Sequence, residues 1–134
     1  MRVRRARGTA WLTLKEPAPG GGGVKHRHEY ESEVADPDAI ERVFEALGMV
    51  EQFRYEKYRR VYDVGDVVAC LDETPIGCFL ELEGSVDSVT AEVERLGLTM
   101  DNAVLASYPE LYEEHRRRSA EAPPFMVFSE DRHR

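Results

Sequence analysis

The sequence predicts a single α+β domain in which antiparallel strands are interrupted by two helices. Several segments alternate charged residues with other residues, as partly exposed strands do. Two segments carry apolar residues at helical spacing, and each lies between strand-like segments. Turn-forming residues separate neighbouring strand-like segments, as in hairpins. This order suits an antiparallel α+β domain better than a doubly wound α/β sheet.

The first part of the chain is predicted to be extended. Residues 3–15 contain two short strands separated by the turn-like pair Arg7-Gly8. A Pro- and Gly-rich run over residues 17–23 predicts a flexible hairpin loop. Residues 24–34 then alternate as a further strand would.

The two inserted helices have clear start and stop signals. Asp36 can cap the first, and Pro37 at its first position loses no hydrogen bond. Ser85 caps the second helix, and glycine follows each helix as a terminator. The apolar positions at helical spacing are Ile40, Val43, Phe44 and Leu47 in the first helix, and Val86, Val89, Val93 and Leu96 in the second.

The remaining elements are strands, a third helix and a tail. Residues 49–62 are predicted to be extended, and residues 67–71 and 78–83 flank a turn as a hairpin. A third helix is predicted over residues 108–118. We therefore expect a domain over residues 1–118 and a tail over residues 119–134. The tail has an apolar patch at residues 125–128, and we expect a weakly ordered end rather than a docked segment.

Composition excludes several classes of protein. The chain has 134 residues, 42% of them apolar, which fits one globular domain. A net charge of −8 argues against a nucleic-acid partner. No apolar run is long enough to span a membrane, and the basic residues 1–7 lack the apolar stretch of a secretory signal. We expect a cytoplasmic protein with Cys70 and Cys78 as reduced thiols outside any zinc site.

Charged side chains repeat on one face of several predicted strands, because residues two apart on a strand point the same way. For any one strand, a solvated outer face explains the pattern. The same pattern of charged residues on one face recurs in five strands. This weakens that explanation, since solvent faces normally also carry Ser, Thr, Gln and Asn. The sets that share a face are Arg2 with Arg4, Thr13 with Lys15, Lys25 with Arg27, Glu29 and Glu31, Lys57 with Arg59, and Glu81 with Glu83.

If the sheet closes into a barrel with these faces inward, charges of both signs line its interior. Unpaired buried charges are very costly, so such an interior would hold water, ions or a highly charged ligand. Arginine and lysine suit a polyanion such as a triphosphate. Pairs of glutamates suit hard divalent cations, which take oxygen ligands and bridge phosphates.

The sequence resembles the CYTH superfamily, whose members are also called triphosphate tunnel metalloenzymes. This superfamily joins class IV adenylyl cyclases and thiamine triphosphatases. Within it, the sequence is most similar to the class IV cyclase branch. The resemblance covers about residues 1–115, and its ordered motifs are MRVR (1–4, for an LRIR-like strand), LTLK (12–15), RHEYE (27–31, for RxExE), KYR (57–59, for KxR), LD (71–72) with GCFLELEG (77–84), and SYPEL (107–111, for SYxEL).

The resemblance implies an eight-stranded antiparallel tunnel with helices packed outside, holding a triphosphate with Mg²⁺ or Mn²⁺. Phosphate oxygens would be held by Arg2, Arg4, Lys15, Arg27, Lys57 and Arg59, and Lys25 joins these candidates because it shares a face with Arg27. The acids implied for the metal are Glu81 and Glu83, with Glu29, Glu31 and Asp72 orienting either the basic groups or the metal shell. For Asp72 the alternative is a turn residue that bonds nearby backbone.

One family motif, ExExK, is not in the sequence. In the family it lies on a first strand, before the LRIR segment, and supplies two metal carboxylates and a lysine proposed as general base. We therefore assign no general base, and expect weak polyphosphate binding with little or no turnover. We favour a start codon assigned too late, with a natural fragment or a trimmed chain as the alternatives. A missing strand would leave a sheet edge free, which invites a homodimer.

The sequence leaves three functions open. The first is an adenylyl cyclase that converts ATP to cyclic AMP and pyrophosphate. The second is a triphosphatase acting on inorganic tripolyphosphate or thiamine triphosphate. The third is a non-catalytic module that binds polyphosphate or nucleotide. Product analysis separates the first two, because both use the same tunnel for positioning and charge neutralisation.

Overall fold

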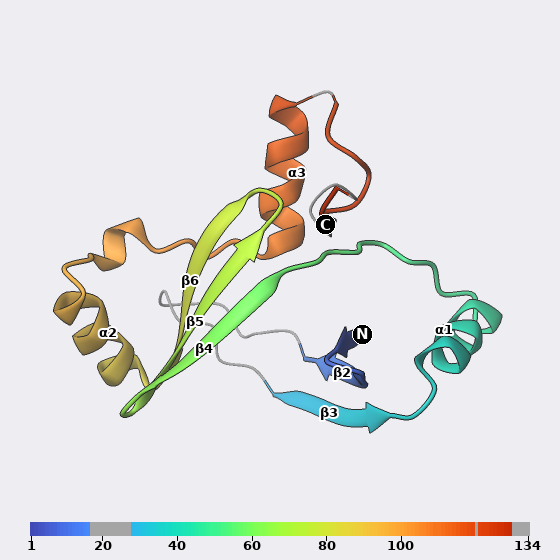
Figure 1. Cartoon of the computed structure of the whole chain (residues 1–134), viewed down its shortest axis with the longest axis horizontal. Helices are drawn as coiled ribbons and strands as arrows, with labels where there is room; N and C mark the ends of the chain where they lie inside the picture. The colour runs from blue at the N-terminus through green and yellow to red at the C-terminus, as the bar shows by residue number, and fades with distance from the viewer. Residues whose placement is uncertain (17–27, 120, 130–134) are drawn as a thin grey trace. The chain divides into compact units, whose positions relative to one another are not determined.

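The computed structural model describes residues 1–16, 28–119 and 121–129. The chain divides into two compact units, Met1–Gln52 and Phe53–Arg134, called here the N-terminal and C-terminal units. Each described unit contains a three-stranded antiparallel sheet and at least one α-helix (Figure 1). The predicted α+β class is therefore confirmed.

The sheet of the N-terminal unit consists of β1 (Arg2–Ala6), β2 (Thr9–Lys15) and β3 (Glu29–Val34), in that order. The turn between β1 and β2 needs two residues with positive φ, Arg7 (51°) and Gly8 (80°). The helix α1 (Pro37–Ala46) follows β3, and the Asp36 side chain accepts a hydrogen bond of 2.8 Å from the backbone of Ala39. The predicted cap, proline start and turn are all confirmed.

The register of this sheet places the predicted charged residues on one face. Thr13 in the central strand pairs with Arg2 on one side and with Glu31 on the other. Lys15 pairs directly with Glu29. The Thr13 side chain is fully buried, whereas Leu14, which points to the opposite face, is 45% exposed.

The sheet of the C-terminal unit consists of β4 (Tyr58–Val64), β5 (Val67–Thr74) and β6 (Gly77–Gly84), joined as two hairpins. The pairing of Val64 with Val67 and of Thr74 with Gly77 leaves two-residue turns, and Gly65 supplies a positive φ of 68° in the first. Such short turns fix the register of the hairpins. Figure 1 shows the three strands side by side as a long, twisted sheet.

Three helical elements follow β6: α2 (Val86–Arg95), the short 3₁₀ helix η1 (Met100–Asn102) and α3 (Tyr108–Arg118). Ser85 caps α2 by accepting a hydrogen bond from the backbone of Ser88, as predicted. Ser107 and Glu110 form a reciprocal capping box at the start of α3. This box fixes the start of α3, whose first residue is Tyr108.

The expectation of a weakly ordered tail is wrong for residues 121–129. Met126 is fully buried and forms a parallel bridge with Tyr55. Its backbone donates to the carbonyl of Arg54 (3.0 Å) and accepts from the amide of Glu56 (2.9 Å). The apolar patch docks because it completes a core whose buried members in this unit are Val67, Ala69, Cys70, Val93, Tyr112, Met126 and Phe128.

The described strands form two open sheets, so the structure does not show the predicted closure into an eight-stranded barrel. Among the described helices, none has the length and apolar character that crossing a membrane requires.

Candidate functional site

A buried aspartate organises the charged face of the C-terminal unit. Asp72 lies in β5 and its side chain is fully buried, although it is a carboxylate. A buried charge is stable only when neighbours of opposite charge and hydrogen-bond donors compensate it. The residues around Asp72 provide both.

Four hydrogen bonds converge on the Asp72 carboxylate. Arg59 donates from Nε to Oδ1 (2.6 Å) and from Nη2 to Oδ2 (2.7 Å). Lys57 donates from Nζ to Oδ2 (2.6 Å). The Tyr108 hydroxyl donates to the same Oδ2 (2.7 Å). The Asp72 carboxylate therefore holds both basic side chains.

The strand register explains why these side chains meet. Arg59 in β4 pairs directly with Asp72 in β5. Lys57 comes two residues before Arg59 and reaches the same carboxylate, as the alternation of a strand predicts.

Burial and hydrogen bonding act in opposite directions on the pKa of Asp72. Burial raises that pKa, but the hydrogen bonds from Arg59, Lys57 and Tyr108 outweigh it and hold the pKa well below its usual range. The hydrogen bond to Asp72 also raises the pKa of Arg59. Burial, followed by the hydrogen bond to Asp72, raises the pKa of Tyr108 far above its usual range. At neutral pH the carboxylate and guanidinium are charged and the phenol is protonated.

Two glutamates of β6 extend this charged group. Glu81 accepts a hydrogen bond from Arg59 Nη2, and its Oε1 lies 3.7 Å from Lys57 Nζ. Glu83, two residues further along β6, has its Oε1 3.8 Å from Arg59 Nη1. The side chain of Glu81 is 36% exposed and that of Glu83 is 62% exposed. We call Lys57, Arg59, Asp72, Glu81, Glu83 and Tyr108 the Asp72 cluster.

Tyr108 was not among the site residues predicted from the sequence. Its ring lies edge-on to Phe79, with centroids 5.4 Å apart, and beside Tyr55 at 5.5 Å. Lys57 Nζ lies 4.9 Å from the centroid of the Tyr108 ring, within the range of a cation–π contact. The available signal was the SYPEL segment, which resembles a family motif, but the sequence gives no indication that its tyrosine reaches Asp72.

The N-terminal unit holds a second charged group. Glu31 accepts hydrogen bonds from Thr13 (2.8 Å) and Arg4 (3.2 Å). The Arg4 guanidinium also lies over the Trp11 ring, 4.4 Å from its centroid. Lys15 bonds Glu29. The structure thus brings Arg4, Lys15, Glu29 and Glu31 onto one face with Arg2, whereas Lys25 and Arg27 lie outside the described residues.

The donor set can be tested against a divalent cation. Carboxylate oxygens are the ligands that Mg²⁺ and Mn²⁺ prefer. Within the described parts of the chain, no three His, Cys, Asp or Glu side chains are grouped as metal ligands. Glu81 and Glu83 fit a Mg²⁺-type site that takes one or two protein carboxylates and completes its shell with phosphate oxygens and water.

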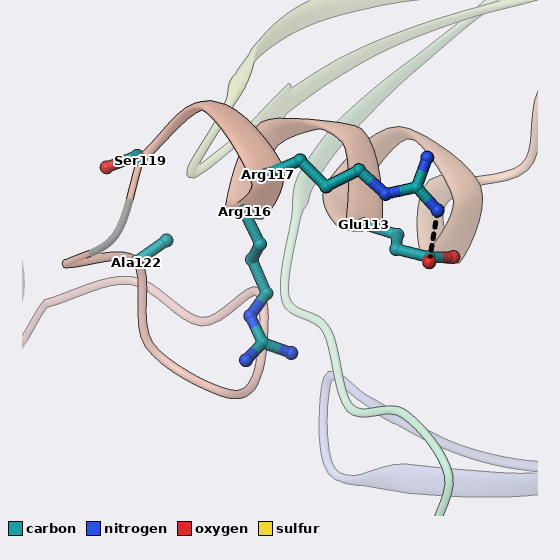
Figure 2. Close-up of a pocket in the computed structure, with 5 residues that line it drawn as sticks. All are labelled: Glu113, Arg116, Arg117, Ser119 and Ala122. Atoms are coloured by element: carbon teal, nitrogen blue, oxygen red, sulfur yellow. Dashed lines mark hydrogen bonds and ion pairs between the residues drawn. The ribbon is translucent and has the colours of Figure 1, made fainter.

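The C-terminal unit also has a shallow pocket away from the Asp72 cluster. It is lined by residues of α3 and the tail, namely Glu113, Arg116, Arg117, Ser119 and Ala122. Figure 2 shows Arg117 paired with Glu113, whereas Arg116 extends in another direction. None of the residues that line it is among the site residues predicted from the sequence.

The fold defines a class of α+β protein whose antiparallel sheets each carry a face of acidic and basic side chains. The family model of the CYTH domain matches residues 1–118, and the chain belongs to this family. A relative from Methanocaldococcus jannaschii, named "Putative adenylate cyclase MJ0240", is 29% identical over 122 residues, which is 83% of this chain and 69% of the relative. The solved structure of the PH1012 protein from Pyrococcus horikoshii OT3 is similar with a TM-score of 0.68 and 26% identity, covering 78% of this chain and 68% of that one.

The membership in the CYTH superfamily that the ordered motifs predicted is therefore confirmed.

Proposed function

We propose that this chain binds the triphosphate of ATP together with Mg²⁺ or Mn²⁺, and that its reaction is the class IV cyclase conversion of ATP to cyclic AMP and pyrophosphate, at low turnover because no general base is assigned. The observation that carries the proposal is the Asp72 cluster, in which one buried carboxylate holds Arg59 and Lys57 beside two partly exposed glutamates. The relative named as an adenylate cyclase favours the cyclase over other reactions of the family.

The two basic residues suit phosphate oxygens in different ways. Arg59 presents a planar fork, and its orientation is fixed by the paired bonds to Asp72. Lys57 is a compact point charge on a flexible stem, and its side chain is 20% exposed. A phosphate could therefore reach Lys57 without disrupting the Arg59–Asp72 pair.

The charge balance of the cluster favours a role for metal. Lys57 and Arg59 contribute two positive charges, and Asp72, Glu81 and Glu83 contribute three negative ones, so the sum is −1. A bare triphosphate would be repelled by this group. A divalent cation on Glu81 and Glu83 would change the sum to +1, and when bound it would neutralise and bridge phosphate oxygens.

In this proposal the chain's own residues bind and orient the phosphates. The oxygen of the ribose 3′-hydroxyl attacks the α-phosphorus and its proton passes to water, while the bond from the α-phosphorus to the bridging oxygen of the β-phosphate breaks and pyrophosphate leaves. Arg59 and Lys57 would hold phosphate oxygens so that the chain is aligned for this displacement. We also propose that the chain belongs to an eight-stranded tunnel in which a second charged face binds the same ligand. The residues of that face are Arg2, Arg4, Lys15, Glu29 and Glu31.

The test combines binding with product analysis. Calorimetry with ATP and with tripolyphosphate, each with and without Mg²⁺, measures the binding. Chromatography after incubation with ATP and metal identifies the products. Cyclic AMP with pyrophosphate supports the cyclase, whereas orthophosphate released from tripolyphosphate would identify a triphosphatase. Absence of triphosphate binding in the presence of either metal would overturn the proposal.

A further inference from the structure

Three hydrogen-bond donors, one of them the Tyr108 hydroxyl, meet at one oxygen of Asp72. Asp72 Oδ2 accepts from Lys57 Nζ (2.6 Å), Arg59 Nη2 (2.7 Å) and Tyr108 OH (2.7 Å). A carboxylate has about four lone-pair positions on its two oxygens, so one oxygen offers about two. Oδ2 therefore has one donor more than its lone pairs require.

Lys57 is the donor that can leave most easily. Arg59 is tied to both oxygens of Asp72 and also to Glu81. Tyr108 is the first residue of α3, and its ring packs against Phe79 and Tyr55. Lys57 makes one hydrogen bond to Asp72, with the looser contacts to Glu81 (3.7 Å) and to the Tyr108 ring (4.9 Å) beside it, and it has a flexible side chain that is partly exposed.

We propose that Tyr108 is a positioning residue that keeps Asp72 satisfied, so that Lys57 is free to move from Asp72 to a phosphate of the ligand. With Tyr108 and Arg59 in place, Oδ2 keeps two donors after Lys57 leaves. Without the hydroxyl, the departure of Lys57 leaves a fully buried carboxylate oxygen with one donor, which is unfavourable. This inference rests on the proposed phosphate-binding role of Lys57.

The hydroxyl can be removed without removing the ring. Tyr108→Phe keeps the aromatic contacts with Phe79 and Tyr55 and removes the hydroxyl, which donates to Asp72 and also interacts with Glu81. Tyr62→Phe is the matched control, because Tyr62 is 49% exposed and lies on the opposite face of the same sheet. Both variants are expected to fold, which thermal unfolding checks.

The first measurement is affinity for tripolyphosphate with Mg²⁺ by calorimetry. We expect Tyr108→Phe to weaken binding about tenfold, the effect of one hydrogen bond to a charged group, and Tyr62→Phe to leave it unchanged. In a Lys57→Met background, Tyr108→Phe should have no further effect, because the residue that it releases is gone. Independent, additive losses from Lys57→Met and Tyr108→Phe, or unchanged affinity in Tyr108→Phe, would overturn the inference.

The second measurement needs no ligand. The rate at which acetic anhydride acylates the Lys57 amine, followed by mass spectrometry, reports how firmly Asp72 holds it. We expect the rate to fall severalfold in Tyr108→Phe and not in Tyr62→Phe, with Lys15 as the internal reference. An unchanged rate at Lys57 refutes the positioning role. If the wild-type chain binds no tripolyphosphate but this rate falls, the proposed function fails and the hold of Tyr108 on Asp72 and Lys57 stands.

Discussion

Arg59 and Asp72 face each other at one register position of the β4–β5 hairpin, and two parallel hydrogen bonds of 2.6 and 2.7 Å join their side chains. The backbone pairing therefore aligns the side-chain pairing. Because the two-residue turn at Gly65 and Asp66 fixes this register, the folded hairpin itself holds the guanidinium in place.

Replacing Asp72 by asparagine should destabilise the chain. Asp72→Asn keeps the shape but removes the charge that compensates Lys57 and Arg59. We expect a loss of about 2–3 kcal/mol in the free energy of unfolding, less than for a wholly buried pair because both basic side chains are partly exposed. Urea unfolding measures it, with the exposed Asp63→Asn as control. Equal stability of Asp72→Asn and the wild type would contradict this prediction.

The contribution of Asp72 should depend on pH in a defined direction. Its folded pKa is lowered, so the folded state binds this proton less readily than the unfolded state. The stabilisation is therefore present above the ordinary aspartate pKa of about 3.9 and is lost as pH falls toward the folded pKa. Without metal, the stability difference between wild type and Asp72→Asn should be constant above about pH 5 and shrink below about pH 4. A difference that grows on acidification would show the opposite linkage.

The Mg²⁺ dependence of tripolyphosphate binding should require the two glutamates of β6, Glu81 and Glu83. In the wild type, Mg²⁺ should strengthen tripolyphosphate binding at least about tenfold, because it reverses the net charge of the cluster. In a Glu81→Gln, Glu83→Gln double variant the metal-free binding should become tighter, since two negative charges are gone, and Mg²⁺ should add little. Calorimetry with and without a chelator measures both effects.

A control with the same change in net charge tests whether the effect is local. Glu113→Gln with Glu114→Gln removes two carboxylates from α3, where they pair with Arg117 and Arg118. This variant should keep the Mg²⁺ dependence of the wild type. Equal behaviour of the two double variants would show that Glu81 and Glu83 have no special part in metal binding.

The docked tail should support both stability and the site. Met126 is fully buried, so Met126→Ala should lower the free energy of unfolding by about 2–4 kcal/mol. It should also weaken tripolyphosphate binding, because the backbone of Met126 bonds Arg54 and Glu56 just before Lys57. Met100→Ala is the control, since Met100 is 37% exposed. Unfolding in urea and calorimetry provide the two measurements, and unchanged values for Met126→Ala would contradict the role of the tail.

Much of the fold is predictable because its signals are local. Asp36 with Pro37, and Ser85, act through backbone groups within four residues, so the sequence around each is sufficient to place the helix start. The alternation of a strand likewise predicted that Lys57 and Arg59 share a face, and both reach Asp72. The extended segment predicted over residues 49–62 was only partly right, because regular strand pairing begins at Tyr58.

The contacts that sequence reasoning missed are long-range. Tyr108 is 36 residues from Asp72 along the chain, and Phe128 donates to Glu56 from 72 residues away. Nothing local in SYPEL or in the tail specifies these partners, since the first depends on where the start of α3 lies relative to β5 and the second on where the tail docks. By composition, an apolar patch in a Pro-rich, charged tail resembles a disordered terminus. Its docking site forms only when the rest of the unit has folded.

The bridge between Tyr55 and Met126 also has a consequence for the order of events during synthesis. The ribosome releases the segment before Lys57 long before it has made residue 126, and domains fold as their parts emerge. Both β-hairpins can form early because their contacts are local, whereas the segment that carries Lys57 must wait for its partner strand. A nascent chain arrested before residue 126 would therefore hold Arg59 against Asp72 while Lys57 still lacks its final support.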